Sequence, residues 1–185
     1  MPDEFNPIIE QISKEYPAVG RHLRNIRIQR GDKSKFLSGG SIEFFPSWEK
    51  FNPNPGQHTI EIYDKKLVGD SLKSAITGDA LHLMGGVDPI TKTPYDPGFR
   101  KMKEAFSQTF TPQQVQMDLR NYNEARKNEG ETRSFDDWLD SSRTDAYIRG
   151  YLFPDERDEW RKQGIYTPDQ TQLLENIKAY LLQNQ

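Results

Sequence analysis

Asp79 and His82 are the residues of this chain whose types and spacing could most readily do chemistry. They lie three positions apart in a segment with helical periodicity, so they fall on neighbouring turns of one helix. The apolar residues of that segment form one face of a helical wheel: Val68, Leu72, Ala75, Ile76, Ala80 and Leu83. Asp79 falls near the middle of that face and His82 on its flank. An unpaired charge there would be very costly, so His82 or a backbone N–H must donate to it. The pair is a catalytic candidate, but a satisfied polar contact is the more frequent meaning of such a pattern.

The segment Gly78-Asp79-Ala80-Leu81-His82, expected on a helix that follows a strand, resembles the core of the zincin-type metallopeptidases. Their helix carries His-Glu-x-x-His, in which two histidines hold zinc and the glutamate activates water. The resemblance makes His82 the second zinc ligand and puts Asp79 in place of the glutamate. Gly78 stands where the first ligand would be, and glycine cannot bind zinc. The resemblance therefore implies a degenerate relative. A zinc site would need further ligands from His58, Glu61 or Asp88.

A second polar group lies in the segment 138–152, which has the pattern of one long helix. Asp145 and Arg149 are four residues apart, and Trp138 shares their face of the wheel. One interpretation is an anion or substrate pocket framed by arginines. The other, which we favour on general grounds, is a structural ion pair that fixes the helix against its neighbours.

Aromatic residues supply candidate contact surfaces for a protein partner. Five stand out: Phe44, Phe45 and Trp48 in one short segment, and Tyr147 and Tyr151 on one side of a helix. Large aromatic residues often anchor interfaces. They are more often simply core, which is the alternative for all five.

Charge and composition exclude several classes of function. The 185 residues include 25 Lys and Arg against 28 Asp and Glu, so a net charge of −3 gives no general attraction for polyanions. Arg24, Arg27 and Arg30 form a local basic stretch, but on a strand they divide between faces, so nucleic-acid binding is a minor alternative. With 0 cysteines, disulfides and thiolate zinc sites are excluded. No apolar run approaches the roughly 20 residues that span a membrane, and the acidic start lacks the features of a signal peptide.

The expected elements indicate an α+β fold in a single domain, residues 1–185, with an α/β part over 1–66 and a helical part over 67–185. A short helix at about 4–16 should end at Pro17 and Gly20. Strands are expected near 23–29, 41–45 and 58–63, and helices near 68–85, 97–109, 112–128, 135–152 and 168–183. Thr111 with Gln114, and Thr167 with Gln170, have the spacing of capping boxes.

Three segments are similar to small proteins encoded by tailed bacteriophages: 52–56, 78–82 and 145–152. This resemblance implies a virion component or a protein made in the host cytoplasm. The function we expect is therefore a non-catalytic structural or interaction protein without a cofactor, whose partners are virion proteins or a second copy. A zinc-dependent hydrolase of degenerate zincin type is the first alternative, and weak association with nucleic acid is the second.

Overall fold

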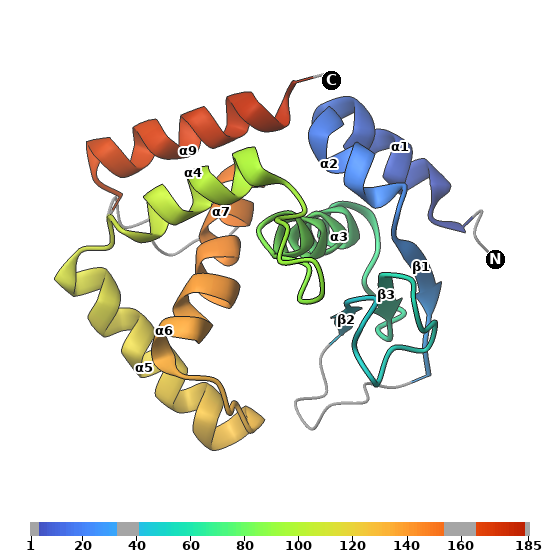
Figure 1. Cartoon of the computed structure of the whole chain (residues 1–185), viewed down its shortest axis with the longest axis horizontal. Helices are drawn as coiled ribbons and strands as arrows, with labels where there is room; N and C mark the ends of the chain where they lie inside the picture. The colour runs from blue at the N-terminus through green and yellow to red at the C-terminus, as the bar shows by residue number, and fades with distance from the viewer. Residues whose placement is uncertain (1–3, 33–40, 154–165, 184–185) are drawn as a thin grey trace. The chain divides into compact units, whose positions relative to one another are not determined.

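The computed structural model describes residues 4–32, 41–153 and 166–183, and its fold is α+β, as the sequence predicts (Figure 1). The chain divides into two compact units. The first comprises Met1–Leu83 with Leu181–Gln185, and the second comprises Met84–Tyr180. The division lies at the end of a helix, whereas the sequence suggested a change of character before that helix, at residue 67.

The first unit begins with two packed helices, α1 (Asn6–Glu15) and α2 (Pro17–Leu23). The first helix ends before Pro17, as predicted, but a second helix that was not predicted follows at once and contains Gly20. Pro17 occupies the first turn of α2, where its missing N–H costs no hydrogen bond. Gly20 lets the two helices approach closely, because a Cβ at this position would lie 2.8 Å from the Ser13 Cα.

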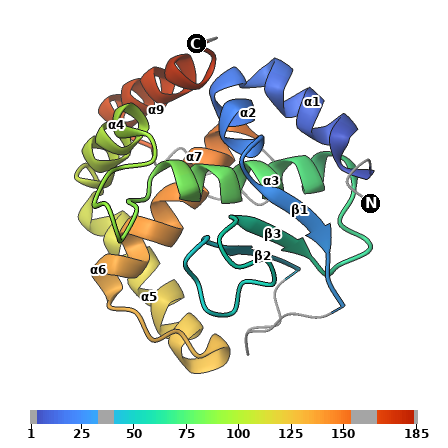
Figure 2. The same ribbon diagram turned by 45° about the vertical axis from the view of Figure 1, so that its right-hand side comes forward.

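A mixed three-stranded sheet follows, in the order β1-β3-β2. It consists of β1 (Arg27–Arg30), β2 (Ile42–Phe45) and β3 (Thr59–Ile62). β1 is parallel to β3 and β2 is antiparallel to it. One face carries the fully buried Ile60 and Ile62 with Phe44, whose ring contacts His82 of α3 (Gly69–Met84). α3 therefore covers this face, as Figure 2 shows.

The other face of the sheet carries a row of polar side chains beside the buried Phe45. Gln29, Glu61 and Glu43 lie side by side across the three strands. Gln29 donates to Glu61 over 3.0 Å, and the Tyr63 hydroxyl donates to Glu43 over 2.9 Å. Both glutamates are buried, and these donors satisfy carboxylates that would otherwise be costly to bury. Burial and the two carboxylates raise the pKa of Tyr63, so its hydroxyl stays a neutral donor.

The second unit is helical. Its elements are α4 (Pro97–Ser107), α5 (Pro112–Glu129), α6 (Phe135–Trp138), a π-helical turn η2 (Leu139–Arg143), α7 (Thr144–Leu152) and nearly all of α9 (Pro168–Leu181). Both predicted capping boxes are present. Their glutamines, Gln114 and Gln170, are fully buried and also bond to each other, with amide N to O distances of 2.9 and 2.7 Å. The starts of α5 and α9 are thereby held together.

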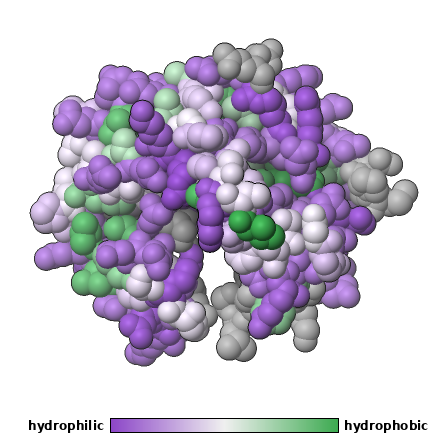
Figure 3. Space-filling view, viewed as in Figure 1, coloured by the Kyte–Doolittle hydropathy of each residue, from purple (hydrophilic) through white to green (hydrophobic). Residues whose placement is uncertain are grey.

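No helix in the described residues combines the length and apolar character that crossing a membrane requires. On the face of the molecule drawn in Figure 3, hydrophobic residues form small separate patches within a mostly hydrophilic surface.

Candidate functional sites

Asp79 and His82 lie on α3, but Asp79 does not occupy the middle of a buried face. Val68 precedes the helix and is 59% exposed, while Lys73, Thr77 and Leu81 are buried. The buried face is therefore turned toward these residues, and Asp79 is half-buried at its flank. The wheel misplaced the face because it counted only apolar side chains as buried.

The two histidines nominated as zinc ligands both contact the ring of Phe44. His58 stacks on it and His82 meets it edge-on, each with a centroid separation of 6.0 Å. Nδ1 of His58 accepts the backbone N–H of Ser47 over 3.0 Å, which occupies one of its two ring nitrogens. Across the described part of the chain, no three His, Asp or Glu side chains gather into a group that could hold a metal ion. The zinc alternative stays a prediction.

Asp145 forms a buried ion pair, and the partner that the structure gives it is Lys103 of α4. The Lys103 Nζ lies 3.0 Å from the Asp145 Oδ1, and the two side chains are 5% and 8% exposed. Arg149, the partner expected from the sequence, is exposed. Asp145 and Arg149 both lie in α7, after the π-helical turn, so that turn changes only their register relative to Trp138: a wheel drawn at 3.6 residues per turn from residue 138 loses register where the turn is wider.

A buried cluster that the sequence did not reveal lies beside this pair. Asp118 of α5 is fully buried and accepts from the Arg143 Nε over 3.0 Å and from the Tyr147 hydroxyl. The Arg143 guanidinium lies 5.0 Å from the ring centroid of Tyr147 and 5.7 Å from that of Trp138. Burial raises the pKa of Tyr147, and its hydrogen bond to Asp118 acts in the same direction.

This cluster, Asp118–Arg143–Tyr147, joins α5 to the π-helical turn η2 and to α7. It balances one positive charge with one negative charge and uses both carboxylate oxygens of Asp118 internally. The π-helical turn ends at Arg143, so it sets where the guanidinium lies. No sequence pattern pointed to Asp118, because its partners Arg143 and Tyr147 are 25 and 29 positions away in the chain.

Of the five aromatic contact candidates, Trp48 is the one that is largely exposed. Phe45 and Tyr147 are buried, and Phe44 is half-buried. Tyr151 is half-buried and donates to Glu175. Trp48 is 52% exposed. It lies in the segment 46–58 between β2 and β3, which we call the aromatic loop.

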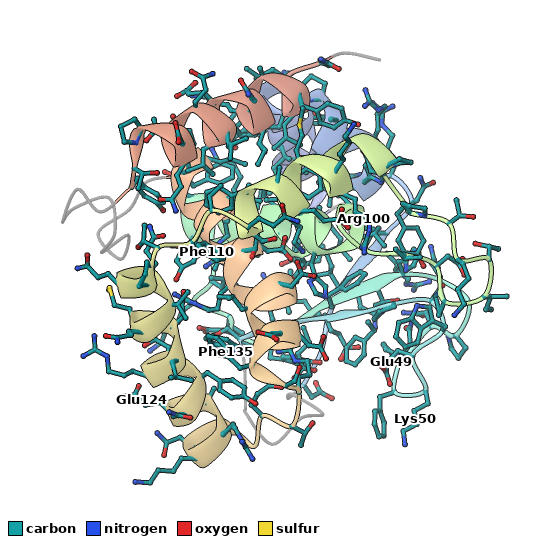
Figure 4. The ribbon with its side chains drawn as sticks, turned by 60° about the vertical axis from the view of Figure 1, so that its left-hand side comes forward. Glu49, Lys50, Arg100, Phe110, Glu124 and Phe135 are labelled. Atoms are coloured by element: carbon teal, nitrogen blue, oxygen red, sulfur yellow. The ribbon has the colours of Figure 1, made fainter. Side chains whose placement is uncertain are left out.

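The aromatic loop contains a second exposed ring, Phe51, which the sequence analysis did not select. Phe51 is 49% exposed, and the Lys50 Nζ lies 4.8 Å from its ring centroid. Figure 4 shows the Lys50 side chain directed away from the ribbon at the turn of this loop. The pattern Trp48-Glu49-Lys50-Phe51 between prolines was a usable signal, because prolines exclude these rings from a regular element that could bury them.

Asn52 fixes the backbone of the aromatic loop. Its side chain is 5% exposed, and its Nδ2 donates to the carbonyls of Pro46 over 2.9 Å and Gln57 over 2.7 Å. Its Oδ1 accepts the N–H of Asn54 over 2.8 Å. Asn54 in turn donates to Gln29 of β1 over 3.0 Å, which ties the loop to the sheet. The two exposed rings therefore stand on a backbone that is already ordered.

Comparison with protein families, with curated protein sequences and with solved structures finds no match for this chain.

Proposed function

We propose that this protein is a non-catalytic interaction protein that binds a protein partner through the aromatic loop. The observation that carries the proposal is the exposure of Trp48 and Phe51, 52% and 49%, on a loop whose backbone Asn52 holds in place. Large rings are among the strongest contributors to protein interfaces when a partner buries them. Because the loop is ordered before binding, little further conformational entropy is lost on association.

The resemblance to tailed-phage proteins supports a viral setting for this interaction, in the virion or in the host cytoplasm. A partner in that setting is another viral protein or a second copy of this chain. Lys50 over the Phe51 ring and Glu49 beside it give the loop both signs of charge, so a partner with a mixed polar rim around an apolar contact would fit it.

The experiment has two arms that use the full chain. Sedimentation velocity over a range of concentrations tests for a second copy, and selection from a displayed library of folded protein domains and peptides tests for another partner. Association in either arm should weaken at least tenfold in the double variant Trp48→Ala/Phe51→Ala. The control is Ile90→Ala, which removes another exposed apolar side chain, 82% exposed, from the second unit. A chain that binds nothing in both arms, or binds equally well in the double variant, overturns the proposal.

A further inference from the structure

A cavity of about 470 Å³ lies between α1 and β1 in the first unit. Phe5 and Ile9 line it from α1, and Ile28 lines it from β1. Arg24 and Arg27 stand at its border, and both are exposed. Its volume is in the range of sites that take small ligands or single large side chains.

β1 has an open edge beside this cavity. The N–H of Arg27 donates to the His58 carbonyl over 2.8 Å, and the N–H of Gly31 donates to the Ile62 carbonyl over 3.0 Å. Backbone groups alternate in direction along a strand, so the N–H and C=O groups of Ile28 and Arg30 point away from β3. β1 is the terminal strand of the sheet order β1-β3-β2, so within residues 4–32, 41–153 and 166–183 no strand pairs with this edge.

The charge without an ion pair at the start of this edge is positive. Within the described residues Arg24 and Arg27 form no ion pair, and the Arg27 Nε instead donates to the neutral amide of Gln29 over 3.1 Å. Arg30 differs, because Glu4 already pairs with it at 2.6 Å. The unneutralised charge therefore lies at the end of the edge where β1 begins.

We propose that the β1 edge binds an extended, acidic peptide segment of another protein as a fourth strand. Ile28 and Arg30 offer the peptide four backbone hydrogen-bonding groups, two N–H and two C=O. An apolar side chain of the peptide enters the cavity between α1 and β1, and its acidic side chains face Arg24 and Arg27. Main-chain bonds give such a site affinity, and the pocket and the charges give it selectivity. Gln57 of the aromatic loop also lines the cavity, but the exposed rings of Trp48 and Phe51 do not, so the site does not depend on the function proposed for those rings.

The probe is a displayed library of random ten-residue peptides, selected on the full chain. The enriched peptides should be acidic, with β-branched or aromatic residues at alternate positions. Fluorescence anisotropy then measures the affinity of an enriched peptide for each variant. Amide exchange followed by NMR should show that the peptide protects the N–H groups of Ile28 and Arg30, which attraction between side-chain charges alone would not do.

Two pairs of variants test the two parts of the site. Arg30→Pro removes the outward N–H, and Arg30→Ala removes the same side chain while keeping that N–H, so Arg30→Pro should bind at least tenfold more weakly than Arg30→Ala. Proline is tolerated on an edge strand where its nitrogen faces away from the ladder. The exposed double variant Arg24→Glu/Arg27→Glu should lose the acidic peptide at least tenfold without loss of folding. Trp48→Ala/Phe51→Ala should bind the peptide as the wild type does, which separates this site from the aromatic loop.

Three results would overturn the proposal. One is a selection that yields no acidic peptide, or only peptides that bind equally well after charge reversal at Arg24 and Arg27. Another is equal binding by Arg30→Pro and Arg30→Ala without protection of the Ile28 N–H, which would leave charge alone. The third is preferential binding of a single-stranded oligonucleotide to Arg24 and Arg27 in competition with the peptide, which would make this edge a nucleic-acid surface.

Discussion

The aromatic loop and the helical segment 135–147 both place a tryptophan beside charged side chains, but the tryptophan is exposed in the loop and buried in the helical segment. Trp138 is 6% exposed and lies near Arg143, whose charge is balanced by the buried Asp118. Trp48 is 52% exposed, and the loop that carries it is held by a neutral amide. A ring that is packed contributes to the stability of the fold, whereas a ring left in water contributes little to it. The same residue type therefore has a structural role in one unit and is available for binding in the other.

The packing around Trp138 is an aromatic cluster with Tyr122 and Phe135. The ring centroid of Tyr122 lies 5.4 Å from that of Phe135 and 5.5 Å from that of Trp138. Figure 4 shows Phe135 between α5 and the helical segment that begins at α6. Among the ring contacts of the described residues, none involves Trp48.

Replacing each tryptophan by alanine tests most directly whether the two rings differ in their contribution to stability. Trp138→Ala should lower the free energy of unfolding of the second unit by about 3–5 kcal/mol, because it leaves a cavity in a packed cluster. Trp48→Ala should change the free energy of unfolding of the first unit by less than about 0.5 kcal/mol, as for other exposed sites. Urea unfolding with amide exchange as the readout follows each unit by itself. Similar losses in the two variants would show that Trp48 is packed in solution and would remove the basis for the proposed binding surface.

A second prediction concerns Asn52, which we expect to order the backbone of the aromatic loop. Asn52→Ala removes the bonds to the carbonyls of Pro46 and Gln57 and leaves them without their buried donor. We expect a loss of about 2 kcal/mol in the stability of the first unit, since each unsatisfied buried group costs about 1–3 kcal/mol and water can reach part of the opened loop. Amide exchange of Gly56, whose N–H donates to the Ser47 carbonyl, should become faster.

Asn52→Asp is the matched control for this prediction, because it keeps the shape of the side chain and the acceptor for the Asn54 N–H. It replaces the amide NH₂ by a carboxylate oxygen, which has no proton to donate to the carbonyl oxygens of Pro46 and Gln57. It should therefore destabilise the loop at least as much as alanine does. If both variants leave the exchange of Gly56 unchanged, Asn52 does not fix the loop, and the argument from preorganisation fails.

Much of the fold could be predicted because its signals are local. Thr111 and Thr167 begin helices through bonds to residues three positions away, and this spacing is visible in the sequence. The mutual bond of Gln114 and Gln170 was not predictable, because it joins residues 56 positions apart. The helix α2 was not predicted, because Pro17 is compatible with both the end of one helix and the start of the next.

The candidate sites were harder to predict than the fold because they depend on tertiary contacts. The partner of Asp145 is the clearest case, since Lys103 comes from a different helix and no local pattern joins the two residues. The π-helical turn at Leu139–Arg143 was not predicted either, and it changes the register of Asp145 relative to Trp138. Trp48 and Phe45 were selected together as contact candidates, although only Trp48 is exposed; Pro46, which separates Trp48 from β2, was the local signal that could have distinguished them.

Lowering the pH should destabilise the second unit slightly without affecting the aromatic loop, and this is the smallest effect that we expect. Glu131 follows α5 and accepts bonds from Arg133, which lower the pKa of Glu131 to about 2, and the Arg133 carbonyl accepts the hydroxyl of Tyr122 in the aromatic cluster. Because the pKa of Glu131 is lower in the folded state than its ordinary value of 4.5, its contribution to stability is complete above pH 4.5 and is lost as the pH falls from there toward 2.

We expect that loss to be about 1 kcal/mol, because Arg133 is 41% exposed and water screens the pair. Urea unfolding of the second unit between pH 6 and pH 2 measures it, and Glu131→Gln, which cannot titrate, should show a correspondingly smaller dependence on pH. The hydrogen bonds from Asn52 to the carbonyls of Pro46 and Gln57 involve no titrating group. Amide exchange at Gly56, corrected for the intrinsic effect of pH, should therefore have the same pH dependence in the wild type and in Glu131→Gln. If the free energy of unfolding of Glu131→Gln depends on pH as that of the wild type does, the Glu131 carboxylate does not stabilise the turn after α5. Packing of the aromatic rings alone would then hold this turn against Tyr122.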